Sequence, residues 1–427
     1  MMADSMPPML LLPVDAAERI EAWGANWGLF DVRLDPTEDL AVVCGIWRRE
    51  DLRWPARAKW LTGHYLRYAG ERSRVGTWYH TDAALYGLHQ AALARSLAVA
   101  PSALRDAVLG GWRIPPTDRS MPVMTWASDV NGNPVWSVWW VSHDSAVPGL
   151  MEVVSDSSPL SYLGGAWPVD ELGSVSAVVI GVGSIGSVVS ETLADYAVGR
   201  LVLVDPDRLL QHNLVRHRLG PRDLGRLKVR AMRDLLKERH PDLEVEAHPL
   251  DVIFEADQVR PLLSGVDVIV GATDGVASRR VVNHLARRAG VPAILACVLE
   301  NGALGEIIRV RPGSGCLLCY RSRLDAEGAL DPEPELDQEY GLGSPPLPMT
   351  AVAGDLAAVG TLAAKAAVST VLESRGRWAQ RLPGDVAVVG LQPVPGLPQP
   401  FDVERSSEVR WVDLGPSKSG CLTCAAP

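Results

Sequence analysis

The sequence has no excess of positive charge and no long uninterrupted apolar run. Its 427 residues contain 41 Lys and Arg against 51 Asp and Glu, a formal net charge of −10 at pH 7. This balance argues against a general nucleic-acid binder, which needs a dominant basic surface to neutralise phosphates. The apolar stretch 351–372 is interrupted by Asp355 and Lys365, so we expect no membrane-spanning helix. The apolar run 9–14 is too short for a signal-peptide core and lacks a basic flank, so we expect a cytoplasmic protein.

Composition predicts a compact protein of more than one domain. Hydrophobic residues make up 47% of the sequence and charged residues 22%, which is typical of folded chains. Twelve of the 14 Trp residues precede Pro168, and a stretch rich in Ser, Gly and Pro runs over 155–173. We therefore predict a Trp-rich N-terminal accessory domain over residues 1–168 and a second domain over 169–427.

The N-terminal domain is predicted to be mixed α/β. Residues 83–99 have helical spacing, and residues 135–141 alternate like a strand after the turn 131–134. Clustered Trp side chains could stack on sugars or bases, but they are more often core or interface material, and we favour the core. The sequence does not indicate the chemistry of this domain.

The central region predicts a nucleotide-binding unit. A buried-strand run at 175–180 leads into a glycine turn, a helix at 187–196 and a second strand at 201–204 that ends at Asp205. Glycines in such a turn permit a tight bend, close approach of backbone N–H groups to phosphates, and close helix packing. A carboxylate at the position of Asp205 can accept hydrogen bonds from a ribose. The turn contains Gly181, Gly183, Ser184, Ile185 and Gly186.

Residues after the second strand favour ATP over a nicotinamide dinucleotide. Asp207, Asn213, Arg216 and Lys228 follow in order, and the last opens a helix-like segment. The amide and the two cations could each reach a polyphosphate on the glycine turn, and a dehydrogenase does not need them. A further strand-like run at 266–272 ends in Thr273 and Asp274, with Arg279 following. Ligands bind at the carboxyl ends of parallel strands, and an Asp there is a natural Mg²⁺ ligand.

These motifs, in this order, resemble the ThiF/MoeB/HesA family of adenylyltransferases, which are related to ubiquitin-activating enzymes. The resemblance covers about 250 residues, from Val175 to Cys424. It implies an α/β fold with a Rossmann-like, doubly wound sheet and a crossover loop, here at 325–348. It also implies that Asp205 holds the ATP ribose and that Asp274 binds Mg²⁺. Asp207 could assist Asp205, and it could equally be an ordinary turn former. Three residues would bind phosphate: Asn213, Arg216 and Lys228.

Three departures from the family pattern accompany the match. No Arg occurs in 161–174, where family members often carry one that reaches into the site of the partner subunit of a homodimer. Gly275 replaces a common Asn, and His217 replaces a common Gln. Neither replacement removes a charge, so nucleotide binding is expected to survive. We expect His217 itself to be a surface or loop residue.

Two Cys-x-x-Cys pairs predict a structural zinc site. Each pair follows a Gly, which suits the two thiolate knuckles of a tetrahedral Zn²⁺ site. A redox dithiol or disulfides are the alternatives, and a cytosolic setting with two matched pairs favours zinc. The four cysteines are Cys316, Cys319, Cys421 and Cys424.

The other two cysteines, Cys44 and Cys297, lie in apolar strand-like runs and are expected to be inert, and the loop 325–348 contains none. We therefore predict an enzyme that adenylates the C-terminal carboxylate of a ubiquitin-like or sulfur-carrier protein ending in Gly-Gly and forms no thioester of its own. A downstream conjugating or sulfur-transfer enzyme could accept the product. Two alternatives stay open: adenylation of a peptide or amino-acid carboxylate in a biosynthetic pathway, and an inactive scaffold with this fold.

Overall fold

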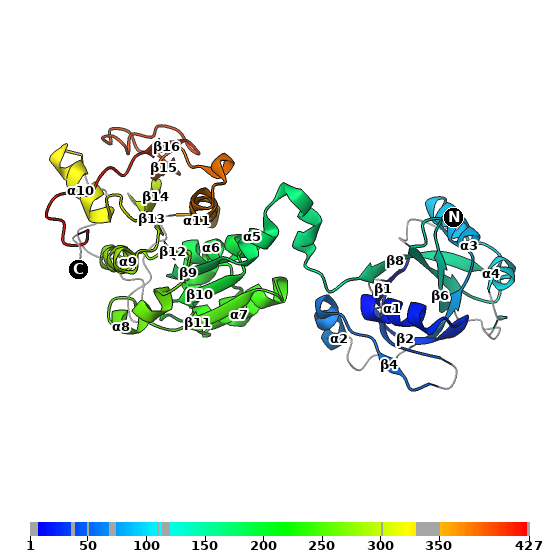
Figure 1. Cartoon of the computed structure of the whole chain (residues 1–427). Coiled ribbons are helices and arrows are strands. Elements are labelled where there is room, and N and C mark those ends of the chain that lie inside the picture. Colours follow the sequence, from blue (N-terminus) through cyan, green and yellow to red (C-terminus); the bar gives the residue numbers. More distant parts are fainter. Residues whose placement is uncertain are drawn as a thin grey trace. The chain divides into compact units, whose positions relative to one another are not determined.

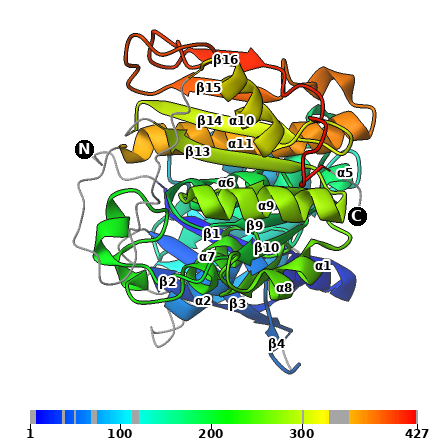
Figure 2. The ribbon, with the colours of Figure 1, turned by 90° about the vertical axis from the view of Figure 1, so that its left-hand side faces the viewer.

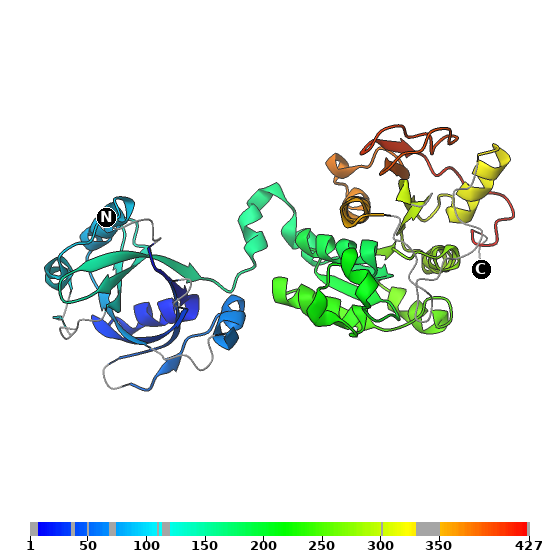
Figure 3. The same cartoon turned by 180° about the vertical axis from the view of Figure 1, so that it is seen from behind.

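The chain forms two compact units, residues 1–157 and 158–427. The structure is a computed structural model that describes residues 7–35, 39–48, 51–67, 74–108, 111–112, 120–299, 302–329 and 351–424. Figures 1 and 3 show the two units from opposite sides. The boundary predicted at residue 168 lies inside the second unit, between its first two helical segments, η2 (Pro159–Ala166) and α5 (Val169–Gly173).

The first unit is built on an eight-stranded sheet whose order is β1-β8-β7-β6-β5-β2-β3-β4. Strand β1 pairs with β8 and also with β3, so the pairing of all strands except β4 closes into a ring. The strands are β1 (Met9–Pro13), β2 (Trp27–Asp35), β3 (Leu40–Trp47), β4 (Trp54–Pro55), β5 (Arg74–His80), β6 (Met121–Ser128), β7 (Pro134–Val141) and β8 (Ala146–Val154). The helices are α1 (Val14–Trp23), η1 (Lys59–Leu61), α2 (Thr62–Arg67), α3 (Ala83–Ala94) and α4 (Pro101–Ala107).

Four tryptophans of this unit lie in its core, as predicted, whereas Trp54 is 40% exposed. Trp78 and Trp139 are fully buried, and Trp126 and Trp140 are 9% exposed. Trp78, Trp126 and Trp140 belong to one apolar cluster together with helix α1. Trp139 packs in a second cluster with residues of α3 and α4. These indole rings supply large apolar area in a unit that has only short helices.

The second unit contains a doubly wound sheet of order β11-β10-β9-β12-β13-β14-β15-β16. The first five strands are parallel, and the last three are joined antiparallel. The strands are β9 (Ser176–Ile180), β10 (Arg200–Val204), β11 (Glu244–His248), β12 (Val268–Gly271), β13 (Ala293–Leu299), β14 (Leu304–Val310), β15 (Val386–Gly390) and β16 (Val409–Val412). The helical segments that follow α5 are α6 (Ser184–Asp195), η3 (Gln211–Val215), η4 (Pro221–Asp223), α7 (Lys228–Arg239), α8 (Ala256–Val259), η5 (Arg260–Leu263), α9 (Val276–Ala289), α10 (Leu317–Ala326), α11 (Ala353–Ser374) and η7 (Trp378–Gln380).

Helices cover both faces of this sheet. One apolar core packs α6, α7 and α11 against it, and a second packs α9 and α10 on the other face, as Figure 2 shows for α9 and α11. Strands β9 and β12 are buried along their whole length, because central parallel strands are covered on both sides. The predicted strands at 175–180, 201–204 and 266–272 are thus observed as β9, β10 and β12.

Helix α11 is long and apolar enough to cross a membrane by length and composition alone. However, 67% of its most apolar window is buried inside the unit. At Gly360 an added Cβ would lie 2.8 Å from Val188 Cβ on α6, so the two helices pack closely. This is the environment of a core helix. The predicted crossover loop precedes α11, and its residues 330–348 lie outside the described residues.

Candidate nucleotide-binding site and cysteine cluster

The glycine turn lies where the strand order reverses, between β9 and β12, which is the position at which ligands bind in open α/β sheets. Gly181 has a φ of +86°, and a Cβ on Gly186 would lie 1.8 Å from the Gly181 carbonyl oxygen. Both positions therefore require glycine. Gly183 precedes Ser184 and Ile185 at the start of α6, and a Cβ on it would meet no atom within 4 Å. The space beside the N-terminus of α6 is open, and this end of a helix favours anions.

Asp205, at the end of β10, holds the glycine turn in place. One carboxylate oxygen accepts the N–H of Val182 at 2.7 Å, and the other accepts the N–H of Asp207 at 2.9 Å. Burial raises the pKa of Asp205, and the nearby charge of Lys228 opposes this shift. Each carboxylate oxygen has a second lone pair, so the predicted ribose contact of Asp205 is compatible with these bonds.

Lys228 is a buried cation at the start of α7. Its Nζ lies 2.8 Å from Asp207 Oδ2, and its side chain is 9% exposed. Burial lowers the pKa of Lys228, but the negative charges of Asp205, Asp207 and Asp274 outweigh burial and raise it. The ammonium group therefore remains charged at neutral pH. Among the described residues Asp207 is the hydrogen-bond partner of its Nζ, so two of its three N–H donors could bind a phosphate.

The turn that carries Asn213 and Arg216 is built on η3. Asn213 Oδ1 accepts the N–H of Leu210 at 2.8 Å, and the Asn213 carbonyl accepts the N–H of Arg216 at 3.0 Å. Phosphate oxygens accept hydrogen bonds, so a contact between Asn213 and phosphate would come from its Nδ2 group, the donor of the amide. Arg216 is half-buried.

Thr273, Asp274 and Arg279 follow β12 on the other side of the glycine turn. Thr273 Cγ2 lies 3.0 Å from where a Cβ on Gly181 would stand. Thr273 Oγ1 is buried and has no hydrogen-bond partner among the described residues. Asp274 is exposed, and Arg279, 3% exposed, points its Nη1 to within 3.5 Å of the Asp274 carbonyl oxygen. The predicted nucleotide-site residues all belong to the segments that follow β9, β10 and β12 at their carboxyl ends.

His217 lies in a loop, as predicted, but its side chain is buried and not on the surface. Its Nδ1 accepts the N–H of Leu219 at 3.0 Å, and its Nε2 lies 2.8 Å from the Val182 carbonyl oxygen. Burial lowers the pKa of His217 to about 4, and the charges of Lys228 and Arg216 add to this effect. The ring is neutral near pH 7 and donates from Nε2. The replacement of the common Gln was the only sequence signal for this role.

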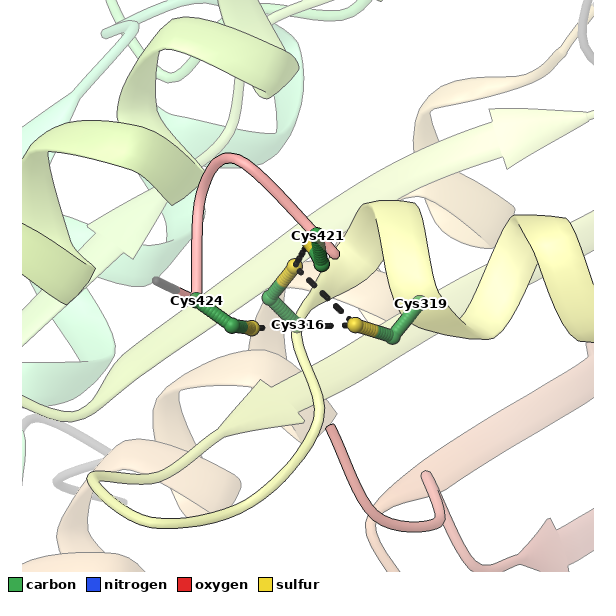
Figure 4. A group of neighbouring side chains, drawn as sticks. All are labelled: Cys316, Cys319, Cys421 and Cys424. Atoms are coloured by element: carbon green, nitrogen blue, oxygen red, sulfur yellow. Dashed lines mark hydrogen bonds between the residues drawn. The ribbon is translucent and has the colours of Figure 1, made fainter. Parts of the chain in front are cut away.

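The four cysteines of the Cys-x-x-Cys pairs form one cluster, shown in Figure 4. Cys316 and Cys319 lie at the start of α10, and the other pair comes from the C-terminal segment. The sulfur atoms of Cys316 and Cys319 are 3.8 Å apart, those of Cys316 and Cys421 3.7 Å, and those of Cys319 and Cys424 3.6 Å. Disulfides require about 2.05 Å. A tetrahedral Zn²⁺ with Zn–S bonds of about 2.3 Å spaces its sulfurs about 3.8 Å apart, so the cluster fits zinc.

Asn283 supports this cluster and was not predicted. It is fully buried on α9, and its Oδ1 accepts the N–H of Leu317 at 3.0 Å, which caps the start of α10. The Lys418 N–H donates to Cys319 Sγ at 3.3 Å. Asn283 lies one helical turn after Arg279, so the same helix contacts the nucleotide site and the cysteine cluster. No sequence motif marks such a capping residue.

The sequence profile of the ThiF family matches residues 161–375, just over half of the chain. This chain belongs to the ThiF family. Ubiquitin-like modifier-activating enzyme 5 of Caenorhabditis briggsae is 30% identical over 186 residues, covering 40% of this chain and 43% of that protein. The same enzyme of Dictyostelium discoideum is 29% identical over 192 residues, covering 41% and 50%. The chain spans about half the length of the curated relatives it matches.

Two solved structures resemble this chain at lower sequence identity. E. coli MccB bound to AMPCPP and MccA is 18% identical with a TM-score of 0.45, covering 60% of this chain and 68% of that chain. PaaA is 16% identical with a TM-score of 0.42, covering 56% and 74%. Likeness at this level carries no argument about the function of this chain.

Proposed function

We propose that this chain is an ATP-dependent adenylyltransferase that activates the C-terminal carboxylate of a ubiquitin-like or sulfur-carrier protein. The observation that carries the proposal is the buried, charged Lys228, ion-paired to Asp207 beside the glycine turn. Membership of the ThiF family and similarity to ubiquitin-like modifier-activating enzymes support it. A nicotinamide site has no need of a buried ammonium group at this place.

In the proposed reaction, a carboxylate oxygen of the partner attacks the α-phosphorus of ATP, and the bond to the β-phosphate oxygen breaks and releases pyrophosphate. ATP supplies the nucleotidyl group, and Mg²⁺ held by Asp274 would supply further positive charge. Lys228, Arg216, Asn213 and the N–H groups at the start of α6 bind and orient the phosphates. No protein nucleophile is needed, because the protein groups only align the carboxylate with the α-phosphate and neutralise the charge on the phosphate oxygens.

The cysteines outside the cluster support an enzyme without its own thioester. Cys297 is 4% exposed on β13, and its Sγ lies 3.9 Å from the carboxylate of Glu306. Burial raises the pKa of the Cys44 thiol, which leaves it protonated at neutral pH. The activated acid would therefore stay an acyl-adenylate until a separate acceptor takes it. A downstream conjugating or sulfur-transfer enzyme, a homodimeric state and a cytoplasmic location belong to the same proposal.

The four clustered cysteines would hold a structural Zn²⁺. Four thiolates leave no open coordination position, so the metal would stabilise the fold and take no part in catalysis. It would tie the C-terminal segment to α10.

Exchange of radiolabelled pyrophosphate into ATP tests the activity. The full chain, with a panel of ubiquitin-like and sulfur-carrier proteins that end in Gly-Gly, should show exchange that depends on one of them. Asp274→Ala should abolish it, whereas Asp257→Ala, which removes an exposed carboxylate on α8, should leave it unchanged. Exchange driven by peptides or amino acids instead would favour the biosynthetic alternative. Tight ATP binding without exchange for any acid would indicate an inactive scaffold.

A further inference from the structure

The sheet of the second unit ends at strand β16, which pairs with β15 on one side only. The carbonyl oxygens of Glu408 and Val412 accept N–H groups from β15 and from the residue before it, at 2.9 and 3.0 Å. Backbone groups of an antiparallel strand point to alternate sides. The N–H and C=O groups of Val409 and Trp411 therefore point away from β15, and no strand of the described part of the chain pairs with them.

The edge of β16 lacks the protection that the other sheet edges have. Edge strands that must stay unpaired usually carry charges or Pro, or are very short. The opposite edge strand of this sheet, β11, carries Glu244 and Glu246. The edge strand of the first unit, β4, has two residues and ends in Pro55. Strand β16 has no Pro, and its one charged residue, Arg410, is already ion-paired to Asp402. Of these three edges, β16 is the most able to accept a further strand.

Val409 and Trp411 also extend the apolar face of the sheet to its edge. Their partners on β15 are Val389 and Ala387, which belong to the core that packs α6, α7 and α11. Trp411 packs against this core and is half-buried, whereas Val409 is 39% exposed. Figure 2 shows β16 at the outer end of the sheet. A further strand would cover both side chains, because its own side chains reach the same face at every second position.

We propose that β16 binds an extended segment of a partner polypeptide, which adds a strand to the sheet. The outward N–H and C=O groups recur at every second residue, and a second extended backbone offers donors and acceptors at the same interval. Apolar side chains at alternate positions of this segment would pack on Val409 and Trp411. Strand β16 is separated from β12 by three strands, so the surface differs from the proposed nucleotide site and does not rest on adenylation.

Fluorescence anisotropy with the full chain tests the proposal. The probe is a fluorescein-labelled peptide of alternating Val and Thr with a Lys at each end, and the same peptide with N-methylated amides is the control probe, which should not bind. Val409→Pro removes one outward N–H at the first position of an edge strand, where Pro is tolerated, and should weaken binding of the probe about tenfold. Val409→Thr keeps the N–H and a branched side chain, so it should bind the probe within about twofold of the wild type.

A second pair of variants tests the same edge without a change in the backbone, in case Val409→Pro lowers the Tm. Val409→Lys places a charge on the exposed edge, which opposes the addition of a strand, and should weaken binding of the probe about tenfold. Val130→Lys places the same charge on a valine of the first unit that is 99% exposed, and should leave binding unchanged.

Three results would overturn the proposal. The N-methylated peptide would bind as tightly as the probe, or Val409→Lys would bind the probe as tightly as Val130→Lys does. The third concerns a second copy of the chain, which is the alternative occupant of this edge. Analytical ultracentrifugation without peptide would then show a dimer that Val409→Lys dissociates and Val130→Lys does not. None of these measurements uses ATP, so their failure leaves the proposed adenylation untouched.

Discussion

His217 donates from Nε2 to the carbonyl oxygen of Val182 at 2.8 Å, and this bond joins the Arg216 turn to the glycine turn. Asp205 accepts the N–H of the same Val182 at 2.7 Å. Both backbone polar groups of Val182 are therefore held by buried side chains. Asp205, which is predicted to hold the ribose, and His217, which is next to the predicted phosphate ligand Arg216, therefore fix the same loop. The phosphates would rest on this loop.

Two replacements of His217 test whether its hydrogen bonds are what positions the glycine turn. Gln can donate from Nε2 and accept at Oε1 with a separation close to that of the imidazole nitrogens, whereas Met can do neither. His217→Gln should bind ATP within about threefold of the wild type. His217→Met leaves the Val182 carbonyl and the Leu219 N–H unsatisfied, each at a cost of about 1–3 kcal/mol, and should weaken ATP binding at least about tenfold. Calorimetric titration with ATP measures the affinity of both variants. Equal ATP affinities of His217→Gln and His217→Met would refute the positioning role of His217.

The same residue predicts a pH dependence of stability. The pKa of His217 is about 4 in the folded protein and about 6.5 when unfolded. Between these values the unfolded state binds more protons, so the free energy of unfolding falls as the pH falls. From pH 7 to pH 5 the loss should be about 2 kcal/mol. Urea unfolding of the wild type and of His217→Gln at pH 7 and pH 5 isolates the contribution of His217 to the free energy of unfolding, because the other groups titrate alike in the two proteins. The same pH response in both proteins would contradict the assignment.

Two glycines of the turn should respond differently to alanine. A Cβ on Gly186 would overlap the Gly181 carbonyl oxygen, so Gly186→Ala should destabilise the second unit by about 3 kcal/mol. Gly183 has a negative φ of −82° and open space around it, so Gly183→Ala should keep the wild-type Tm. Its methyl group would stand where phosphates approach α6, and ATP affinity should fall about tenfold. Thermal unfolding and ATP titration of both variants test this, and a destabilised Gly183→Ala would count against it.

The strands and turns that carry the predicted nucleotide-site residues were predictable because their signals are local. Continuous apolar runs predicted β9, β10 and β12, and each run ends directly before a predicted site residue, as Val204 precedes Asp205. The burial of His217 was not predicted, because Arg216 and Arg218 flank it in sequence. Its burial depends on Val182, which comes from another strand-helix connection. A side chain whose partner is a distant backbone carbonyl leaves no periodic pattern in its own segment.

The first unit was predictable only in part. The strand at 135–141 and the burial of Trp78 and Trp139 follow from alternation and composition. Closure of the ring could not be predicted from alternation or composition, because β1 pairs with both β3 and β8 through contacts far apart in sequence.

Metal analysis tests the cysteine cluster. The full chain should contain about one Zn²⁺, because the sulfur separations of 3.6–3.8 Å match a tetrahedral site. Cys316→Ser should lose the metal and lower the Tm, since metal binding contributes folding free energy that the unfolded chain lacks. Cys44→Ser, in the other unit, should keep both the metal and the Tm. Iron in place of zinc would contradict the zinc assignment. Full zinc content in Cys316→Ser after purification with a chelator would contradict the four-thiolate site, because a site that has lost one of its four ligands should not retain the ion.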